Sequence, residues 1–307
     1  MSRRGRRGGG RPVHGVLLLD KPAGLTSNAA LQRVKRLYRA RKAGHTGSLD
    51  PLATGMLPIC LGEATKISAF LLEADKSYEV EARLGQVTDT GDADGTVLET
   101  HPVPALDAAA IEAVLARFRG PIEQVPPMYS ALKQDGRRLY ELAREGRTVE
   151  RAPRQVTIFE LRLLDQAGDR LRLAVRCSKG TYVRVLVEDI GRALGCGAHV
   201  SALRRTAVAP FPAGQMVTLD TLERVAAESG AAGLDRLLVG VDAAFSHLPP
   251  VALDPVQQSR IRQGQALRWP EDPGQGTWRR LYGADGGFIG VAELVRGQLQ
   301  PRRLMNL

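Results

Sequence analysis

The sequence has no apolar run that approaches the roughly 20 residues needed to cross a bilayer as a helix. The apolar segment 16–19 is also too short for the core of a signal peptide. Cysteine is scarce as well: Cys60, Cys177 and Cys196 are odd in number and form no CxxC pair, which argues against a disulfide framework. Buried thiols fit a reducing compartment, so we expect a cytoplasmic protein.

Motifs for nucleotide and metal binding are missing too. There is no Walker A loop and no GxGxxG segment. The acidic turn 89–95 has the composition of a calcium loop. With Gly95 at the sixth position, however, the first and last positions would be Thr90 and His101, so both defining carboxylates are absent. We interpret the segment as a solvated turn between strands. The histidines have no metal-ligand spacing, so the sequence predicts no zinc site.

Positive charge is what the sequence has in excess. Its 307 residues carry 43 basic and 33 acidic side chains, which gives a net charge of +10. Such an excess suits a polyanionic partner, either a nucleic acid or an acidic membrane surface, although basic side chains also serve solubility. Most of the basic residues are arginine, which has two explanations: the nucleotide composition of the genome, or the bidentate hydrogen bonds that a guanidinium makes to phosphate.

Length and composition indicate one large folded domain with a smaller one attached. Residues 1–12 are rich in Arg and Gly, and we expect a disordered basic tail there. The main domain should span residues 13–248. The pair Pro249-Pro250 indicates a linker, and the segment 249–307, rich in Gly and short strand patterns, indicates a small β-rich domain.

Local patterns mix strands and helices without a strict βαβ rhythm, which favours an α+β fold. Residues 77–84 alternate between apolar and polar side chains, as a half-buried strand does. The other elements that we predict are a strand over 16–19, a helix starting near Thr26, a helix over 107–118, a hairpin of 156–164 with 170–176, and a helix from Tyr182 that ends at Gly195.

The segment 44–55 is the part of the chain best suited to chemistry. Three glycines and one proline in twelve residues indicate a tight loop of defined conformation. Asp50 precedes Pro51, which biases Asp50 toward an extended backbone and away from a helix. Such a loop can present one carboxylate at a fixed angle. On loop composition alone, a surface turn with a capping aspartate is the favoured interpretation.

This loop resembles the signature of the TruB family of bacterial tRNA pseudouridine synthases, in which it carries the nucleophilic aspartate. Four further segments resemble family motifs in the same order, and the match extends from about residue 14 to the C-terminus. The first dozen residues lie outside the pattern, and Ser48 occupies a variable position. The four segments are KPAGLTS at 21–27, KSYE at 76–79, GTYVR at 180–184 and GAHVSALRRT at 197–206.

The resemblance implies a pseudouridine synthase fold, with a mixed, largely antiparallel central sheet, flanking helices and a small PUA-like domain at the C-terminus. It also implies isomerisation of the uridine at position 55 in the T loop of tRNAs. That reaction breaks the N1–C1′ bond, turns the base and rejoins it through C5, so it needs no cofactor. Asp50 would act by a covalent adduct with the sugar, by an adduct with the base, or by removing a sugar proton, and these routes stay open.

The resemblance assigns Arg184 and Tyr78 to catalysis beside Asp50. Arg184 would hold down the pKa of Asp50, whereas without the motif a phosphate contact or a solvated helix position is as good an interpretation. Tyr78 falls on the apolar face of its strand, and periodicity alone makes it a core residue. By resemblance, its ring stacks on the target uracil and its phenol takes part in removing the C5 proton.

Three further residues are implied to contact the substrate. Leu203 would be a core residue on any local interpretation, yet the family match places it against the flipped base. Tyr182 maps to another substrate-contacting position. His45 maps to the space that the target nucleotide leaves, where an imidazole would offset part of the stacking lost by extrusion. Lys21 and Pro22 are interpreted as structural support for the loop.

Two basic stretches and the C-terminal domain are candidates for RNA contact, although a charge run is usually a solvated face. The first stretch is 33–42. The second is 126–154, which resembles the thumb insertion that closes over the tRNA T arm in relatives. We expect tRNA as the partner, no membrane and a monomer. Two rivals remain: an RNA-guided or rRNA-directed synthase, which would lack the thumb, and a catalytically silent RNA-binding or tRNA-folding module, which would not need Asp50 with Arg184.

Overall fold

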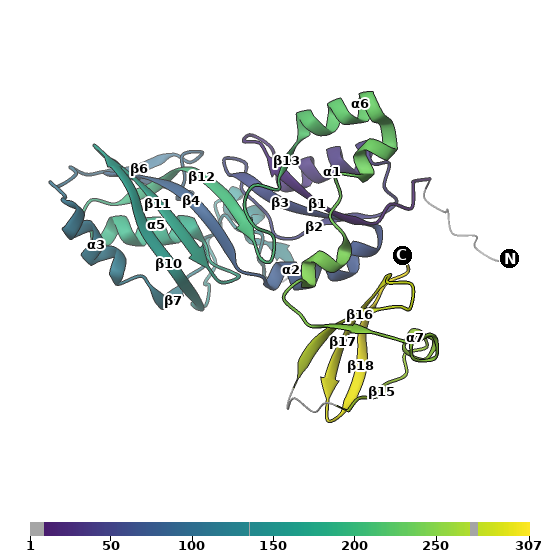
Figure 1. The fold of residues 1–307 in the computed structure, drawn as a ribbon. Helices are drawn as coiled ribbons and strands as arrows, with labels where there is room; N and C mark the ends of the chain where they lie inside the picture. Colours follow the sequence, from purple (N-terminus) through teal and green to yellow (C-terminus); the bar gives the residue numbers. More distant parts are fainter. Residues whose placement is uncertain (1–8, 135, 271–275) are drawn as a thin grey trace.

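The computed structural model describes residues 9–134, 136–270 and 276–307. Figure 1 shows a long sheet with helices packed against it, and a smaller strand-rich domain that carries the C-terminus. The N-terminal part of the sequence predicted as a disordered tail falls mainly on residues 1–8, which lie outside the described residues. From Arg11 onward the chain is held: its backbone N–H donates to Arg39 O at 2.7 Å, and its guanidinium pairs with Asp235 at 2.6 Å.

The central sheet has nine strands, and most neighbouring pairs are antiparallel. The exceptions in the sheet path are β1 with β13 and β3 with β12, which are parallel. The α+β fold with a mixed, largely antiparallel sheet is therefore confirmed. The path runs β13 (Val217–Thr218), β1 (Gly15–Lys21), β3 (Thr54–Leu61), β12 (Ala198–Val208), β4 (Lys76–Leu84), β11 (Arg170–Cys177), β10 (Arg154–Ala167) and β7 (Gly120–Gln124), with β2 (Ala43–His45) paired to β3.

The two halves of the sheet meet where β12 pairs with β3. This pairing is short, with Arg204 opposite Thr54 and Arg205 opposite Gly55. A Cβ at Gly55 would lie 2.2 Å from the carbonyl oxygen of Arg205, so only glycine allows the strands to approach this closely. Because β3 begins directly after the predicted active-site loop, the junction places that loop at the centre of the sheet.

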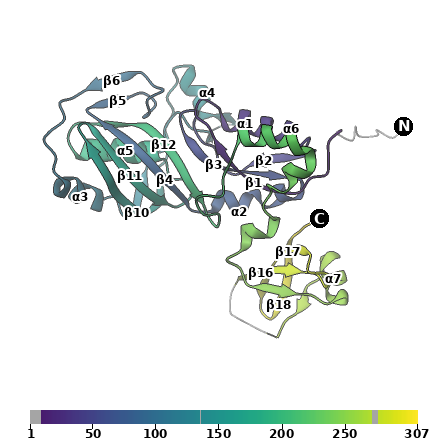
Figure 2. The ribbon, with the colours of Figure 1, turned by 45° about the horizontal axis from the view of Figure 1, so that its top comes forward.

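Four longer helices pack their apolar faces on the main core: α1 (Ser27–Leu37), α3 (Ala108–Ala116), α5 (Val183–Ala193) and α6 (Leu219–Asp235). The Thr26 hydroxyl caps α1 by accepting the N–H of Ala29 at 3.1 Å, and α5 gives way to Gly195 at a φ of 83°. Both ends are where the sequence predicts them. Figure 2 shows α1 beside α6, where the Tyr38 hydroxyl donates to Leu234 O at 2.8 Å.

Shorter elements connect these parts. A 3-10 turn, α2 and a second 3-10 turn cover the other side of β1 and β3, and two separate hairpins extend from the sheet. In chain order they are η1 (Gly62–Ile67), α2 (Ser68–Glu73), β5 (Gln86–Thr88), β6 (Val97–Thr100), β8 (Lys133–Gln134), β9 (Arg137–Arg138), α4 (Leu139–Arg144) and η2 (Val241–Phe245). Among the described residues, no helix is long and apolar enough to cross a membrane.

The C-terminal domain is a five-stranded sheet with one helix and its own small core. A second core joins this domain to the main one: Phe70 of α2 lies 5.1 Å from Phe245 and 5.3 Å from Trp278 between ring centroids, and the fully buried Met305 belongs to the same cluster. The elements are β14 (Pro250–Ala252), α7 (Pro255–Arg262), β15 (Leu267–Arg268), β16 (Thr277–Tyr282), β17 (Phe288–Val295) and β18 (Gln298–Leu304).

Candidate active site

The segment predicted to carry chemistry, 44–55, includes the end of β2, a short loop over 46–53 and the start of β3. The Ser27 hydroxyl, at the start of α1, accepts the N–H of Leu49 at 2.7 Å and donates to the Leu49 carbonyl at 3.0 Å. The Leu49 side chain is buried in the main core. The loop is therefore anchored immediately before Asp50, and the carboxylate of Asp50 extends from a fixed backbone.

Lys21 supports the loop from the end of β1. Its side chain is fully buried, and its ammonium group donates to Leu25 O at 2.7 Å, Pro22 O at 2.9 Å and Pro51 O at 3.4 Å. Burial lowers the pKa of Lys21 to about 8, while the charge of the nearby Asp50 opposes that change. These hydrogen bonds are consistent with the supporting position that the resemblance implies for Lys21 and Pro22.

Asp50 is paired with Arg184, which lies in the first turn of α5. The distance from Arg184 Nε to Asp50 Oδ2 is 3.0 Å. The Arg184 side chain is only 6% exposed, whereas that of Asp50 is 41% exposed. An external reactant can thus reach the carboxylate but not its cationic partner. The structure brings together the two residues on which the sequence comparison placed the chemistry.

Arg184 is shared among three other partners. Its terminal nitrogens donate to Thr90 O at 2.6 Å and to Tyr129 O at 2.7 Å, and one lies 3.5 Å from the Asp92 carboxylate. The Asp92 side chain is 7% exposed. One buried guanidinium therefore connects the Asp50 loop, the acidic turn and the segment that follows β7, so its position is determined by three parts of the chain.

Asp92 is a candidate site residue that the sequence did not reveal. The interpretation of 89–95 as a solvated turn is wrong at this residue, because Asp92 is buried beside Arg184. The turn is fixed to β12, where Val200 N donates to Gly91 O at 3.0 Å and Val200 O accepts the N–H of Ala93 at 2.9 Å. The run of acidic residues was visible in the sequence, but its partner lies about ninety residues away, beyond the reach of any local pattern.

The surroundings of Asp50 act on its ionisation in opposite directions. Burial raises its pKa above the ordinary aspartate value, Arg184 opposes that rise, and Asp92 adds to it. The expectation that Arg184 lowers the pKa describes its own effect correctly, but burial outweighs it. The carboxyl group is therefore less acidic than an exposed aspartate.

The charge of Asp50 interacts with two tyrosine side chains, Tyr78 and Tyr182. Tyr78 is on β4, with its ring packed partly against the main core, and Tyr182 precedes the first turn of α5. Burial raises the pKa of both phenols, and the charge of Asp50 adds to the rise in each. Both will be protonated at neutral pH, so each can donate a hydrogen bond in the site.

Leu203 and His45 are the remaining residues that the resemblance assigns to the site. Leu203 is 8% exposed and sits on β12 opposite Val80, and its carbonyl accepts the Thr54 hydroxyl at 3.4 Å. His45 ends β2, and its buried Nδ1 has no hydrogen-bond partner among the described residues. Burial lowers the pKa of His45, so its ring is neutral near pH 7.

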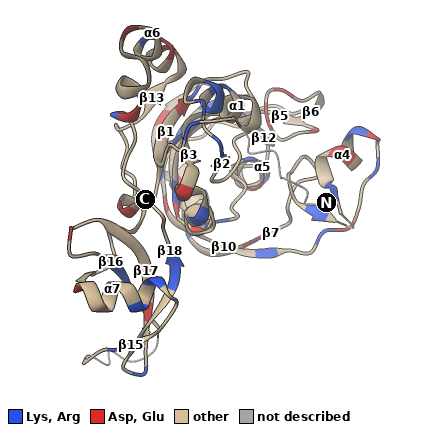
Figure 3. Ribbon diagram, turned by 90° about the vertical axis from the view of Figure 1, so that its right-hand side faces the viewer, with Lys and Arg blue, Asp and Glu red and all other residues tan. Residues whose placement is uncertain are grey.

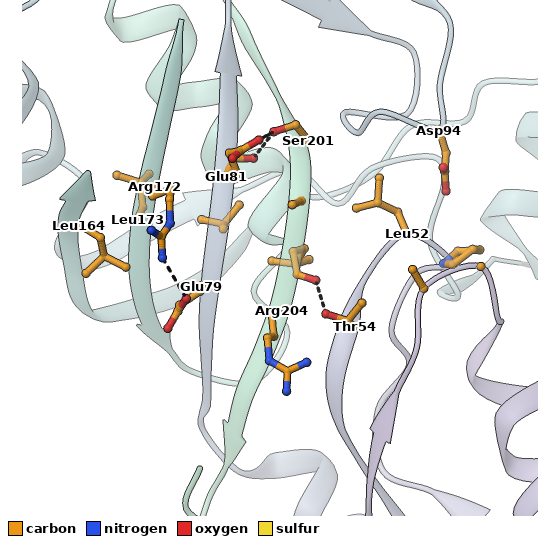
Figure 4. A pocket seen from close by; sticks show the side chains of 16 residues that line it. Leu52, Thr54, Glu79, Glu81, Asp94, Leu164, Arg172, Leu173, Ser201 and Arg204 are labelled. Carbon is orange, nitrogen blue, oxygen red and sulfur yellow. Dashed lines mark hydrogen bonds and ion pairs between the residues drawn. The ribbon is translucent and has the colours of Figure 1, made fainter. Parts of the chain in front are cut away.

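A cavity of about 560 Å³ lies beside the residues that follow Asp50 in the loop. Figure 4 shows the side chains that line it. It shares Pro51, Leu52 and Leu203 with the site, while Asp50, Tyr78 and Arg184 are not among the residues that line it. The other lining residues include charged side chains such as Glu79, which lies 3.6 Å from Arg172, beside apolar ones such as Leu164 and Leu173. The volume is within the roughly 300–1,000 Å³ typical of small-ligand sites.

Exposed basic side chains gather on two parts of the described chain. In α1 and the residues after it, Arg33, Arg36 and Arg39 are exposed, as are Arg41 and Lys42. Figure 3 shows this basic group on α1 and further basic positions around α4. The segment 126–153, between β7 and β10, contains β8, β9 and α4. It touches the site through Tyr129, whose carbonyl accepts a hydrogen bond from Arg184.

Comparison with known families gives matches along nearly the whole chain. Residues 35–183 match the family described as "TruB family pseudouridylate synthase (N terminal domain)". Residues 184–246 match the "tRNA pseudouridylate synthase B C-terminal domain", and residues 249–305 match "Pseudouridine synthase II TruB, C-terminal".

Similar proteins agree with these matches. The chain is 57% identical to the tRNA pseudouridine synthase B of Nitrosococcus oceani, with 98% of this chain and 97% of the relative covered. It is 54% identical to that of Aeromonas salmonicida, with 100% and 98% covered.

Solved structures also share the fold. The protein matched in a Cbf5-Nop10-Gar1 complex is 26% identical, with a TM-score of 0.71 over 92% of this chain and 78% of that one. A chain of an H/ACA RNP bound to a substrate RNA, 23% identical with a TM-score of 0.74 over 96% of this chain and 86% of that one, has the same fold.

Proposed function

The chain belongs to the TruB family of pseudouridylate synthases, and we propose that it isomerises the uridine at position 55 in the T loop of tRNAs to pseudouridine. The observation that carries the proposal is the reachable carboxylate of Asp50, anchored at the tip of a fixed loop and paired with the buried Arg184 at 3.0 Å. The reaction needs a nucleophile or base and no redox group, so these side chains suffice without a cofactor.

Each candidate residue then has a role that fits its position. Asp50 acts on the sugar or the base of the extruded uridine, and Arg184 orients it and favours its ionised form. Asp92 binds the same guanidinium from the other side and so sets how strongly Arg184 holds Asp50. Tyr78 stacks on the uracil, and its phenol takes part when the C5 proton leaves.

The remaining contacts serve base extrusion. Leu203 and Tyr182 contact the flipped base, and the neutral ring of His45 enters the space that the base leaves in the T loop. Extrusion costs a few kcal/mol of lost stacking, which a planar ring in the gap partly offsets.

A stand-alone enzyme is favoured over an RNA-guided one. Relatives named tRNA pseudouridine synthase B match over nearly the full length at 54–57% identity, against 26% for the protein of the Cbf5-Nop10-Gar1 complex. We also infer that the segment 126–154 is the thumb that closes over the T arm, an insertion that RNA-guided relatives would lack. The carbonyl of Tyr129, in this segment, accepts a hydrogen bond from Arg184. Movement of the thumb onto the T arm would therefore act on the residue that orients Asp50.

The fall of the isomerisation rate at low pH should follow the protonation of Asp50. The reaction requires the carboxylate, and burial raises the pKa of Asp50, so single-turnover isomerisation should fall as pH drops through a value above the ordinary aspartate pKa of about 3.9. The measurement is the single-turnover rate on unmodified tRNA against pH, with tRNA saturating at each point. An acid limb at or below the ordinary value would contradict the effect of burial on Asp50.

Neutralising the thumb should reduce the salt dependence of binding. Arg137→Gln with Arg144→Gln removes two exposed charges from the segment. Removal of each phosphate-binding charge should flatten the slope of log affinity against log salt by about 0.7–0.9. Arg162→Gln with Arg176→Gln, exposed arginines on β10 and β11, is the matched control and should leave the slope unchanged. Equal slopes for both pairs would show that the thumb does not contact RNA.

A further inference from the structure

Arg205 is a fully buried cation whose hydrogen bonds go to backbone carbonyls. Its relative exposure is 1%, and among the described residues no carboxylate lies within 4.0 Å of its guanidinium. Its neighbour Arg204 differs in both respects, since it forms a bidentate pair with Asp20 at 3.0 and 2.7 Å and its side chain is 41% exposed. A buried charge is costly unless its hydrogen bonds are satisfied, so the acceptors around Arg205 must hold it in place.

The guanidinium of Arg205 bonds the two ends of the Asp50 loop. Nε donates to Met56 O, after the loop, at 2.6 Å. The terminal nitrogens donate to Gly47 O at 3.2 Å and, at the limit of bonding distance, to Ser48 O at 3.5 Å, both before Asp50. One guanidinium therefore links the backbone before the loop to the backbone after it. Arginine can do this because its N–H donors lie in one rigid plane, whereas lysine has a single ammonium group.

The same guanidinium acts on Tyr78. Arg205 lies directly opposite Tyr78 in the β12–β4 ladder, so the two side chains are cross-strand neighbours. Burial raises the pKa of the Tyr78 phenol, and the charge of Arg205 opposes that rise. The charge also contributes to the lowered pKa values of Lys21 and His45, after burial in each case. The charge of Arg205 therefore acts on three side chains of the site: Lys21, His45 and Tyr78.

We propose that Arg205 is a positioning residue whose guanidinium binds both ends of the Asp50 loop and lies across the strand from Tyr78, so that Asp50 and Tyr78 meet the uracil in a fixed relation. This rests on the proposed function, and in particular on the roles of Asp50 and Tyr78. No bond forms or breaks at Arg205 during the reaction. A merely structural arginine would contribute to folding but would not connect these two reacting groups.

The first test compares Arg205→Lys with Arg204→Lys, by thermal unfolding, tRNA binding and single-turnover pseudouridine formation. Arg205→Lys keeps the charge near Tyr78 but cannot bond Met56 O and Gly47 O together. We expect a folded protein with near-normal tRNA affinity and a rate reduced roughly 100-fold, the size of effect that a misplacement of about 1 Å produces. Arg204→Lys should stay within about threefold of the unaltered chain, because its partner Asp20 is not among the reacting groups.

The second test is a double-mutant cycle with Tyr78→Phe, which separates positioning from general support. If Arg205 acts through the Tyr78 hydroxyl, Arg205→Lys should reduce the rate less in the Tyr78→Phe background than in the unaltered chain. Independent, multiplicative effects would overturn the proposal, as would a wild-type rate for Arg205→Lys. So would loss of folding in both Arg205→Lys and Arg205→Gln, because the residue would then serve the fold at large. If the unaltered chain forms no pseudouridine, the proposed function fails instead.

Discussion

Replacing Asp50 with asparagine should lower single-turnover pseudouridine formation by roughly 10³-fold or more. Asparagine has the size of aspartate but lacks the charge and most of the nucleophilicity, and each of the three open routes uses the carboxylate as nucleophile or base. The loop should keep its conformation, because Ser27 and Leu49 hold it through bonds that do not involve the Asp50 side chain.

Binding should survive that substitution. Asp50 is one residue in a large basic surface, and tRNA affinity should stay within about tenfold, or roughly 1.4 kcal/mol. The matched control is Asp165→Asn, an exposed aspartate at the end of the β10–β11 hairpin, for which both rate and affinity should be unchanged. Wild-type turnover by Asp50→Asn would end the assignment of this residue, and lost turnover together with lost binding would point to a misfolded loop.

Replacing Arg184 with methionine should have the next largest effect. The change removes the 3.0 Å ion pair with Asp50 and the hydrogen bonds to Thr90 and Tyr129, so Asp50 is neither oriented nor favoured in its ionised form. We expect the rate to fall roughly 100-fold or more. Since a cation favours the carboxylate, its loss should also raise the pKa of Asp50 further, and the acid limb of the rate profile should move to higher pH.

Two variants make the Arg184 result interpretable. Arg184→Lys keeps the charge but loses the planar guanidinium that bonds several partners. Its rate should therefore be reduced, while its acid limb should move less than that of Arg184→Met. Arg192→Met removes an arginine from the same helix whose side chain is 77% exposed, and it should behave as the unaltered chain does. A normal rate and an unmoved acid limb for Arg184→Met would mean that the ion pair has no part in the reaction.

Where the structure follows local rules, the sequence predicted it well. The cap at Thr26, the end of α5 at Gly195 and the alternation along β4 depend on residues within a few positions of one another. The hairpin predicted at 156–164 with 170–176 is present, with β10 extended to Arg154–Ala167 because pairing with β7 and β11 lengthens it. Such patterns suffice for elements and for the fold class.

The parts that the sequence did not predict depend on contacts between distant segments. Asp92 belongs to the site only because β12 fixes its turn near Arg184. In the sequence, Arg205 cannot be told apart from its neighbour Arg204 in the same motif. Its buried position follows from the junction of β12 with β3, where it pairs with Gly55. The raised pKa of Asp50 likewise results from its partial burial in the folded chain, which no motif contains.

The most direct test of the proposed function is to incubate the purified chain with unmodified tRNA, without any guide RNA or other protein, and to map pseudouridine at every uridine. We expect one new pseudouridine, at position 55, formed by the unaltered chain and absent with Asp50→Asn. Formation at another position, or none at all with tRNA bound, would contradict this function.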